Sequence, residues 1–278
     1  MRTALGRILD PRDPHQLAIL AAATVGAAIA FVGVFATGAG FQDVSIDGFR
    51  MGVAVFFGWA LAREFDPDHK ISAFIAALLA FVAAIGLGLP RLDVLLWLLV
   101  LSSVLNRIVG IRPTTLDRLF IVALGTWISL AVQWVSVIVT AIALLLDSEM
   151  APTRAHHRVF PVFALAGSVA ASFVGWGELS PQPVVSNLVL IFAVLLLLSV
   201  PLVAASGSVR SKTDFRSHPV LAARLRVTQF LAVGSGAGFA LIFGSAGLLL
   251  LAPMWAALVA GSLFSLKKVL RLPSENQE

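Results

Sequence analysis

The stretch Arg63-Glu64-Phe65-Asp66-Pro67-Asp68-His69-Lys70 is the densest run of ionisable side chains in the chain. It separates an apolar segment that ends near residue 62 from another that begins at residue 71. Apolar segments that alternate with short charged connections are typical of helices that cross a membrane and turn at its surface. The stretch therefore predicts a turn at one membrane surface, with a spanning helix on either side.

The composition of the whole chain supports this interpretation. Of the 278 residues, 59% are hydrophobic and only 13% are charged, whereas a soluble domain has about 25% charged residues. A transmembrane β-barrel would show alternating polarity, and runs such as Leu195–Leu198 do not alternate. We therefore predict an all-α, polytopic transmembrane helix bundle in the cell membrane.

The chain contains no cysteine, which excludes disulfides, thiolate metal sites and a cysteine nucleophile. Its net charge of +5 is a possible mark of nucleic-acid binding. In a membrane protein, however, basic loops face anionic lipid head groups on the cytosolic side. We therefore expect the lipid bilayer, and no nucleic acid, as the partner.

Residues 116–147 admit two interpretations. As one straight helix they would be about 48 Å long, against a hydrocarbon core of about 30 Å. Two helices with a turn near Gln133-Trp134 would each be short for a span. With two helices, all 20 Lys and Arg residues except Arg50 and Arg91 lie on the cytosolic side, whereas one helix would place more than half of them outside. The positive-inside rule therefore predicts about ten spans in five hairpins, with both termini inside (N-in/C-in).

The domain organisation follows from this topology. We expect residues 1–14 to be a cytosolic N-terminal segment, 15–267 a single transmembrane domain and 268–278 a cytosolic tail. The predicted spans cover residues 16–37, 48–63, 71–88, 92–109, two within 116–147, 159–176, 184–204, 221–243 and 246–266. Trp97, Trp127, Trp134 and Trp176 fall near the predicted external surface, where an aromatic belt is common.

The opening stretch also holds the first candidate site. Carboxylates and an imidazole can hold Mg²⁺, Mn²⁺ or Zn²⁺, so Asp66 and Asp68 are candidate metal ligands, and Glu64, Asp68 and His69 are candidate substrate-binding residues. Any cofactor is unknown beyond a divalent metal. The competing interpretation is structural: Asp66 caps the next helix and Pro67 is its first residue, as predicted also for Asp13-Pro14.

A second candidate lies in the linker 106–118. Asn106, Arg107, Arg112 and Arg118 make this linker basic. Its arginines, Arg107 and Arg112 above all, can clamp a phosphate, because a guanidinium group matches phosphate oxygens in pairs. Alternatively, these arginines only anchor the linker at the cytosolic surface. Thr114-Thr115-Leu116-Asp117 predicts a capping box at the start of the following helix.

Glycines cluster in the predicted span 221–243 and just after it. Gly234, Gly238 and Gly244 fit close helix packing, although a flexible gate is an alternative because glycine weakens a helix. A dinucleotide-binding loop is excluded, since no strand precedes the glycines.

Every charged residue is predicted in a loop or at the end of a span. Ion-coupled transporters usually carry ionisable groups inside the bundle, and the sequence indicates no pair of broken helices. We favour a transporter of a small or amphiphilic solute, without indicated coupling to protons or sodium ions. The alternatives are a membrane-embedded enzyme acting on lipid or polyprenyl phosphate head groups at the cytosolic face, and a non-catalytic membrane scaffold; the sequence does not establish whether the chain is an enzyme.

Overall fold

The computed structural model describes residues 4–5, 12–132, 134–150, 159–174, 186–215 and 218–270. Within these ranges the chain forms α-helices, one short 3₁₀ helix and no β-strand, so the all-α class is confirmed. The elements are α1 (Pro14–Phe35), α2 (Phe41–Phe65), α3 (Lys70–Leu87), α4 (Leu92–Asn106), α5 (Thr115–Ala131), α6 (Val135–Glu149), α7 (Val159–Val174), α8 (Ser186–Ala205), η2 (Ser206–Ser208), α9 (Ala222–Leu250) and α10 (Ala252–Leu270).

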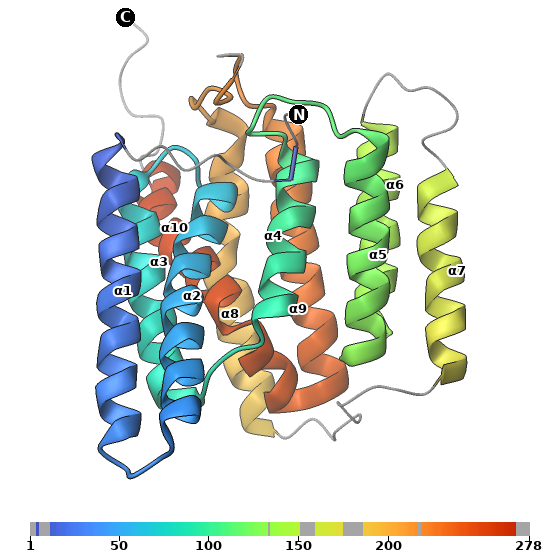
Figure 1. Cartoon of the computed structure of the whole chain (residues 1–278). Coiled ribbons are helices and arrows are strands. Elements are labelled where there is room, and N and C mark those ends of the chain that lie inside the picture. The colour runs from blue at the N-terminus through green and yellow to red at the C-terminus, as the bar shows by residue number, and fades with distance from the viewer. Residues whose placement is uncertain are drawn as a thin grey trace, which may run out of the picture.

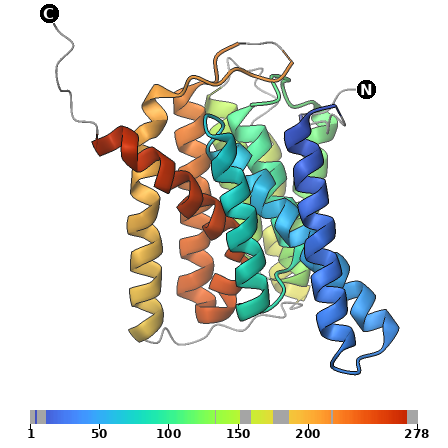
Figure 2. The ribbon, with the colours of Figure 1, turned by 90° about the vertical axis from the view of Figure 1, so that its left-hand side faces the viewer.

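The helices stand side by side, and the chain runs up and down between two ends of the bundle (Figure 1). The α2–α3 turn, the α4–α5 linker and the α8–α9 loop lie at one end, which we call the polar end. The turns α1–α2, α3–α4, α5–α6 and α9–α10 lie at the opposite end. In Figure 2, α10 crosses the bundle obliquely between α8 and α3.

Four of the described helices, α1, α2, α3 and α9, are long and apolar enough to cross a membrane. Shorter apolar helices are α4 and the parts Val189–Ala205 and Ala252–Leu266 of α8 and α10. Large apolar side chains such as Val32, Phe49 and Leu197 are exposed on the outside of the bundle. Several long apolar helices with apolar outer faces suggest a membrane protein.

Residues 116–147 form two helices rather than one, as predicted. α5 ends at Ala131 and α6 begins at Val135. The two helices pack closely at Gly125 of α5. Gly125 lies against Thr140, and its carbonyl oxygen accepts a hydrogen bond from the Ser136 hydroxyl at 3.3 Å.

The prediction for the start of α2 was wrong. The helix begins at Phe41, seven residues before the expected position 48. Its first turns bury Val44 and Gly48 on one face while Phe41, Gln42 and Asp43 are exposed. Averaged hydropathy missed these turns, because only one face of the helix is apolar and buried.

Close helix contacts lie at Gly236, which packs directly against Trp255 of α10 as the glycine spacing suggested, and at glycines outside that region. A Cβ added at Gly52 of α2 would lie 2.8 Å from the Ala23 carbonyl oxygen of α1, and one at Gly58 would lie 2.7 Å from the Ala80 Cβ of α3. Small residues thus let α1, α2 and α3 approach closely. In contrast, a Cβ at Gly234 would meet no atom within 4 Å, and one at Gly238 would meet only the Val135 Cγ1 at 3.9 Å.

Gly244 forms a kink in α9 and not the helix-packing contact that was predicted. Its φ of 58° and ψ of −133° are not helical, so α9 consists of two helical pieces joined at a kink. Glycine tolerates this conformation because it has no Cβ. The kink lies at the boundary that the sequence predicted between residues 243 and 246.

The predicted tryptophan belt is confirmed only in part. Trp127 and Trp134 are exposed, but Trp97 is buried in α4, and its indole N–H donates to the Thr140 hydroxyl at 2.9 Å. Trp176 lies outside the described residues.

Candidate functional site

The α2–α3 turn differs from the capping interpretation of Asp66-Pro67. Asp66 is the C-cap residue of α2, and its backbone N–H donates to the Ala62 carbonyl at 2.7 Å. The N-cap of α3 is His69, whose side chain makes no capping hydrogen bond. The prediction that Asp66 caps α3 was therefore wrong, whereas Asp13 does cap α1, with Pro14 as its first residue.

Asp66 and His69 form a pair inside this turn. The His69 Nδ1 lies 2.9 and 3.1 Å from the two carboxylate oxygens of Asp66, and the ring stacks on Phe264 at 5.6 Å. The Asp66 side chain is buried. Burial raises the pKa of Asp66 above its ordinary value, and His69 opposes this shift.

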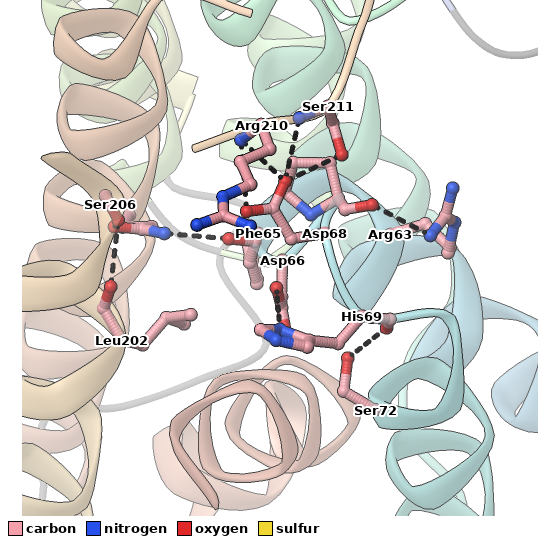
Figure 3. Close-up of polar contacts among 12 residues, drawn as sticks. Arg63, Phe65, Asp66, Asp68, His69, Ser72, Leu202, Ser206, Arg210 and Ser211 are labelled. Carbon is pink, nitrogen blue, oxygen red and sulfur yellow. Dashed lines mark hydrogen bonds and ion pairs between the residues drawn. The ribbon is translucent and has the colours of Figure 1, made fainter. Parts of the chain in front are cut away.

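Asp68 points away from Asp66 and binds the α8–α9 loop (Figure 3). Its carboxylate accepts hydrogen bonds from the backbone N–H groups of Arg210 and Ser211, at 3.1 and 2.9 Å, and from the Ser211 hydroxyl at 2.8 Å. A carboxylate that accepts several N–H and O–H groups in this way fixes the position of a loop. Asp68 thus joins segments that are 143 positions apart in the sequence.

A small cavity of about 20 Å³ lies between these groups and the helices α8, α9 and α10. Its lining includes Asp66, Asp68, His69 and Gln229. This volume is enough for about one water molecule and too small for an organic substrate.

Gln229 of α9 connects the turn to η2. Its amide nitrogen donates to the Phe65 carbonyl at 2.7 Å, and its amide oxygen accepts from the Ser206 hydroxyl at 2.6 Å. Both polar atoms of this fully buried side chain are therefore satisfied.

Glu64 connects the same turn to the α4–α5 linker. The Asn106 side-chain nitrogen donates to the Glu64 carboxylate at 2.5 Å and to its carbonyl oxygen at 3.0 Å. The Asn106 side-chain oxygen accepts from the Ile108 N–H at 3.1 Å. Polar contacts therefore continue from the α2–α3 turn into the linker.

Next to Asn106 lies a group of four buried or mostly buried residues, Arg107, Arg118, Asp147 and Arg224, which we call the arginine cluster. The Asp147 carboxylate lies 2.5 Å from Arg107 Nη2, 3.1 Å from Arg118 Nη2 and 3.1 Å from Arg224 Nη1. Arg118 also donates to the Pro113 carbonyl, and Arg224 to the carbonyls of Leu105 and Met150. The cluster thereby joins the polar ends of α4, α5, α6 and α9.

The predicted site residues are only partly brought together. Glu64, Asp66, Asp68 and His69 lie on one turn, and Arg107 lies beyond Asn106. Arg112 is exposed. Within the described ranges, no three His, Cys, Asp or Glu side chains gather in a way suited to a metal ion; metal binding by Asp66 and Asp68 stays a prediction.

Sequence reasoning placed Arg118 in the basic linker, but it did not identify Asp147, Arg224 and Gln229 as site residues. Asp147 and Arg224 are 77 positions apart, so no local motif joins them. The available signal for Asp147 was its position at a predicted helix end, and for Gln229 its polar side chain inside a predicted span. The capping box that fixes the start of α5 was predicted and is confirmed, since Thr114 and Asp117 cap each other's backbone N–H groups.

A second feature of the bundle is an apolar groove of about 520 Å³ bounded by α3, α8, α9 and α10. Its lining includes Ala83 of α3, Leu198 of α8, Leu248 of α9 and Trp255 of α10. Ligand sites typically have volumes of about 300–1,000 Å³. The groove is therefore large enough for a ligand, whereas the cavity beside Asp66 is too small.

The helices α8 and α10 are in close contact beside the polar cavity. A Cβ added at Gly261 would lie 3.1 Å from a Leu202 methyl carbon and 3.2 Å from the Asp66 Cβ. Leu202 follows the groove residue Leu198 by one helical turn and also lines the polar cavity. Leu202 thus links the α8 face of the groove to the wall of the polar cavity.

Comparison with known proteins adds no further constraint: no protein-family model, curated protein or solved structure matches this chain.

Proposed function

We propose that this protein is a ten-span membrane protein, with both termini on the cytosolic side, that transports an amphiphilic solute. The apolar groove bounded by α3, α8, α9 and α10 carries the proposal. Its lining is almost entirely hydrocarbon, which suits an alkyl or isoprenoid chain better than a polar metabolite.

The kink in α9 is the second support for transport. Ser245, Leu248 and Leu249, which follow Gly244, all line the groove. Transporters commonly bind their substrate beside interrupted helices, where the backbone can change direction. A change at Gly244 would alter the groove without disturbing the rest of α9.

The contact of Leu202 with Gly261 suggests how the route is closed. In the proposed transporter, that contact closes the groove toward the polar cavity beside Asp66. The polar end carries most of the described basic residues, which supports its assignment to the cytosolic side. The proposed transporter is thus closed toward the cytosol.

A flipping assay with a single-chain amphiphile tests the proposal. The purified protein is reconstituted into phosphatidylcholine vesicles that contain fluorescent NBD-labelled lysophosphatidylcholine, and dithionite is added outside. Dithionite bleaches only the outer leaflet of protein-free vesicles. With the protein, we expect the inner-leaflet probe to be bleached as well.

The matched variants are Ala83→Phe and Val82→Phe. Ala83 lines the groove, whereas Val82 is its neighbour on α3, is exposed and lies outside the lining. We expect Ala83→Phe to abolish inner-leaflet bleaching and Val82→Phe to retain it. Equal activity of the two variants, or no bleaching with the unaltered protein, would refute transport of amphiphiles through this groove.

A further inference from the structure

The arginine cluster has more positive than negative charge. Three guanidinium groups surround the single carboxylate of Asp147, which leaves an excess of two positive charges among these four residues. Asp147, Arg118 and Arg224 are almost fully buried, and the Arg107 side chain is 15% exposed. Uncompensated charge removed from water is costly, so such a cluster favours an additional anion.

Arg107 has donors that the cluster does not use. Its Nη2 donates to Asp147, while its Nε is buried and has no hydrogen-bond partner in the described part of the chain. A guanidinium group carries five N–H donors in a planar fork. The Nε of Arg107 is therefore a buried donor that lacks an acceptor.

The backbone of Arg107 has an unusual left-handed conformation. Its φ of 54° and ψ of 34° lie in the left-handed region, and among the described residues it is the one non-glycine residue with positive φ. A helix that ends in this way usually has glycine at the position. An arginine is less favourable than glycine in this conformation, so we expect its guanidinium group to supply an interaction that glycine cannot.

We propose that the arginine cluster binds a phosphate group at the polar end of the bundle, with Arg107 as the principal contact. The anion supplies the missing negative charge and accepts from the Nε edge of Arg107. Arg118 and Arg224 act through their charge, since their donors already bind Asp147 and backbone carbonyls.

Arginine matches a phosphate because two parallel N–H groups meet two oxygens. Electrostatics supports the same site: burial lowers the pKa of Arg107, Asp147 opposes this shift, and Arg224 and Arg118 lower the pKa further, so an additional anion would relieve the remaining repulsion. The phosphate can belong to a lipid head group or to a soluble phosphate, because both present the same oxygens. This inference does not depend on the proposed transport.

Thermal unfolding of the purified full-length chain in a neutral detergent tests the proposal. One arm adds inorganic phosphate at constant ionic strength, with chloride as the reference. The other arm adds dioleoyl phosphatidic acid to the micelles, with dioleoylglycerol, which has no phosphate, as the reference. A ligand that binds only the folded state raises the unfolding temperature, and its concentration dependence gives the affinity.

Arg107→Lys and Arg112→Lys are the matched variants. Lysine at 107 keeps the charge beside Asp147, so the fold is retained, but it loses the planar fork. We expect roughly tenfold weaker phosphate binding in Arg107→Lys and unchanged binding in Arg112→Lys, because Arg112 is exposed and outside the cluster.

The two arms separate the possible sources. A response to phosphatidic acid alone assigns a lipid head group, a response to inorganic phosphate alone assigns a soluble ligand, and a response to both assigns the phosphate group itself. The proposal is overturned if neither ligand raises the unfolding temperature. It is also overturned if Arg107→Lys binds as tightly as Arg112→Lys.

Discussion

Arg224 Nη1 lies 3.1 Å from the Asp147 carboxylate, although the two residues are 77 positions apart in the chain. The same guanidinium group donates to the Leu105 and Met150 carbonyls. One side chain of α9 therefore holds the ends of α4 and α6 together at the polar end of the bundle. Asp147 is the common acceptor of this arrangement.

Asp147→Asn should destabilise the protein strongly. Removing the carboxylate charge leaves three neighbouring guanidinium groups without their counter-ion, and breaking a buried ion pair costs about 3–5 kcal/mol. Thermal or denaturant unfolding in detergent measures the loss. Asp93→Asn is the control, since the partly exposed Asp93–Arg91 pair contributes less than about 1 kcal/mol. Equal losses in both variants would contradict the assigned importance of Asp147.

Alanine at two glycines should have opposite effects on stability. Gly52→Ala places a Cβ 2.8 Å from the Ala23 carbonyl oxygen, so we expect a loss of about 1–3 kcal/mol from overpacking. Gly234→Ala meets no atom within 4 Å and should gain about 0.5–1 kcal/mol from helix propensity. Unfolding temperatures of the two variants check the signs. A loss of stability in Gly234→Ala would favour the packing contact that the sequence suggested.

Asp68→Ala should release the α8–α9 loop. The carboxylate accepts three hydrogen bonds from Arg210 and Ser211, and without them the loop opens more often. Trypsin should then cleave after Arg210 or Lys212 several-fold faster, since removing about 1 kcal/mol of loop stability raises the open population about fivefold. Asp43→Ala, at the opposite end of the bundle, serves as the control. Unchanged cleavage of Asp68→Ala would show that other contacts hold the loop.

The stability of the protein should depend on pH through Asp66. Its pKa in the folded protein is raised above 3.8 by burial. At pH values between 3.8 and this raised pKa, the folded state therefore binds more protons than the unfolded state. The stability contribution of Asp66 is then fully present below pH 3.8 and is lost as the pH rises through the raised pKa.

We compare unfolding temperatures of the unaltered protein and Asp66→Asn from pH 4 upward. The unaltered protein should lose stability relative to the variant as the pH rises. His69 and Asp68 are the charged neighbours of Asp66, so the variant His69→Gln measures how much of the pH dependence of stability comes from His69. A difference between the two proteins that grows in the opposite direction would show that the His69 pair outweighs burial.

The ten-span topology can be tested with single cysteines, because the chain has none of its own. Gly38 lies in the α1–α2 turn and Gly88 in the α3–α4 turn, both at the end predicted to be external, and Lys212 lies in the α8–α9 loop at the polar end (Figure 1). In intact cells, a membrane-impermeant maleimide should label Gly38→Cys and Gly88→Cys and should label Lys212→Cys only after permeabilisation. Labelling of Lys212→Cys in intact cells would reverse the assigned orientation.

Local patterns predicted much of the secondary structure. The break between α5 and α6, the Asp13 cap of α1 and the capping box of α5 are present as expected, because each depends on neighbouring residues. The start of α2 was predicted seven residues too late, since its first turns are polar on one face. The apolar groove was not predictable, because it is formed by four helices from both halves of the chain.

By itself, the sequence determined the all-α class, the apolar character of the helices and the placement of charged residues at helix ends, because hydrophobicity and charge act over short stretches of chain. Only the tertiary structure decided which of those charges meet. Asp66 pairs with His69, whereas Asp68, two residues away, binds Ser211. Which side chains face one another depends on how each helix is rotated and packed against distant helices, and no spacing along the chain records this.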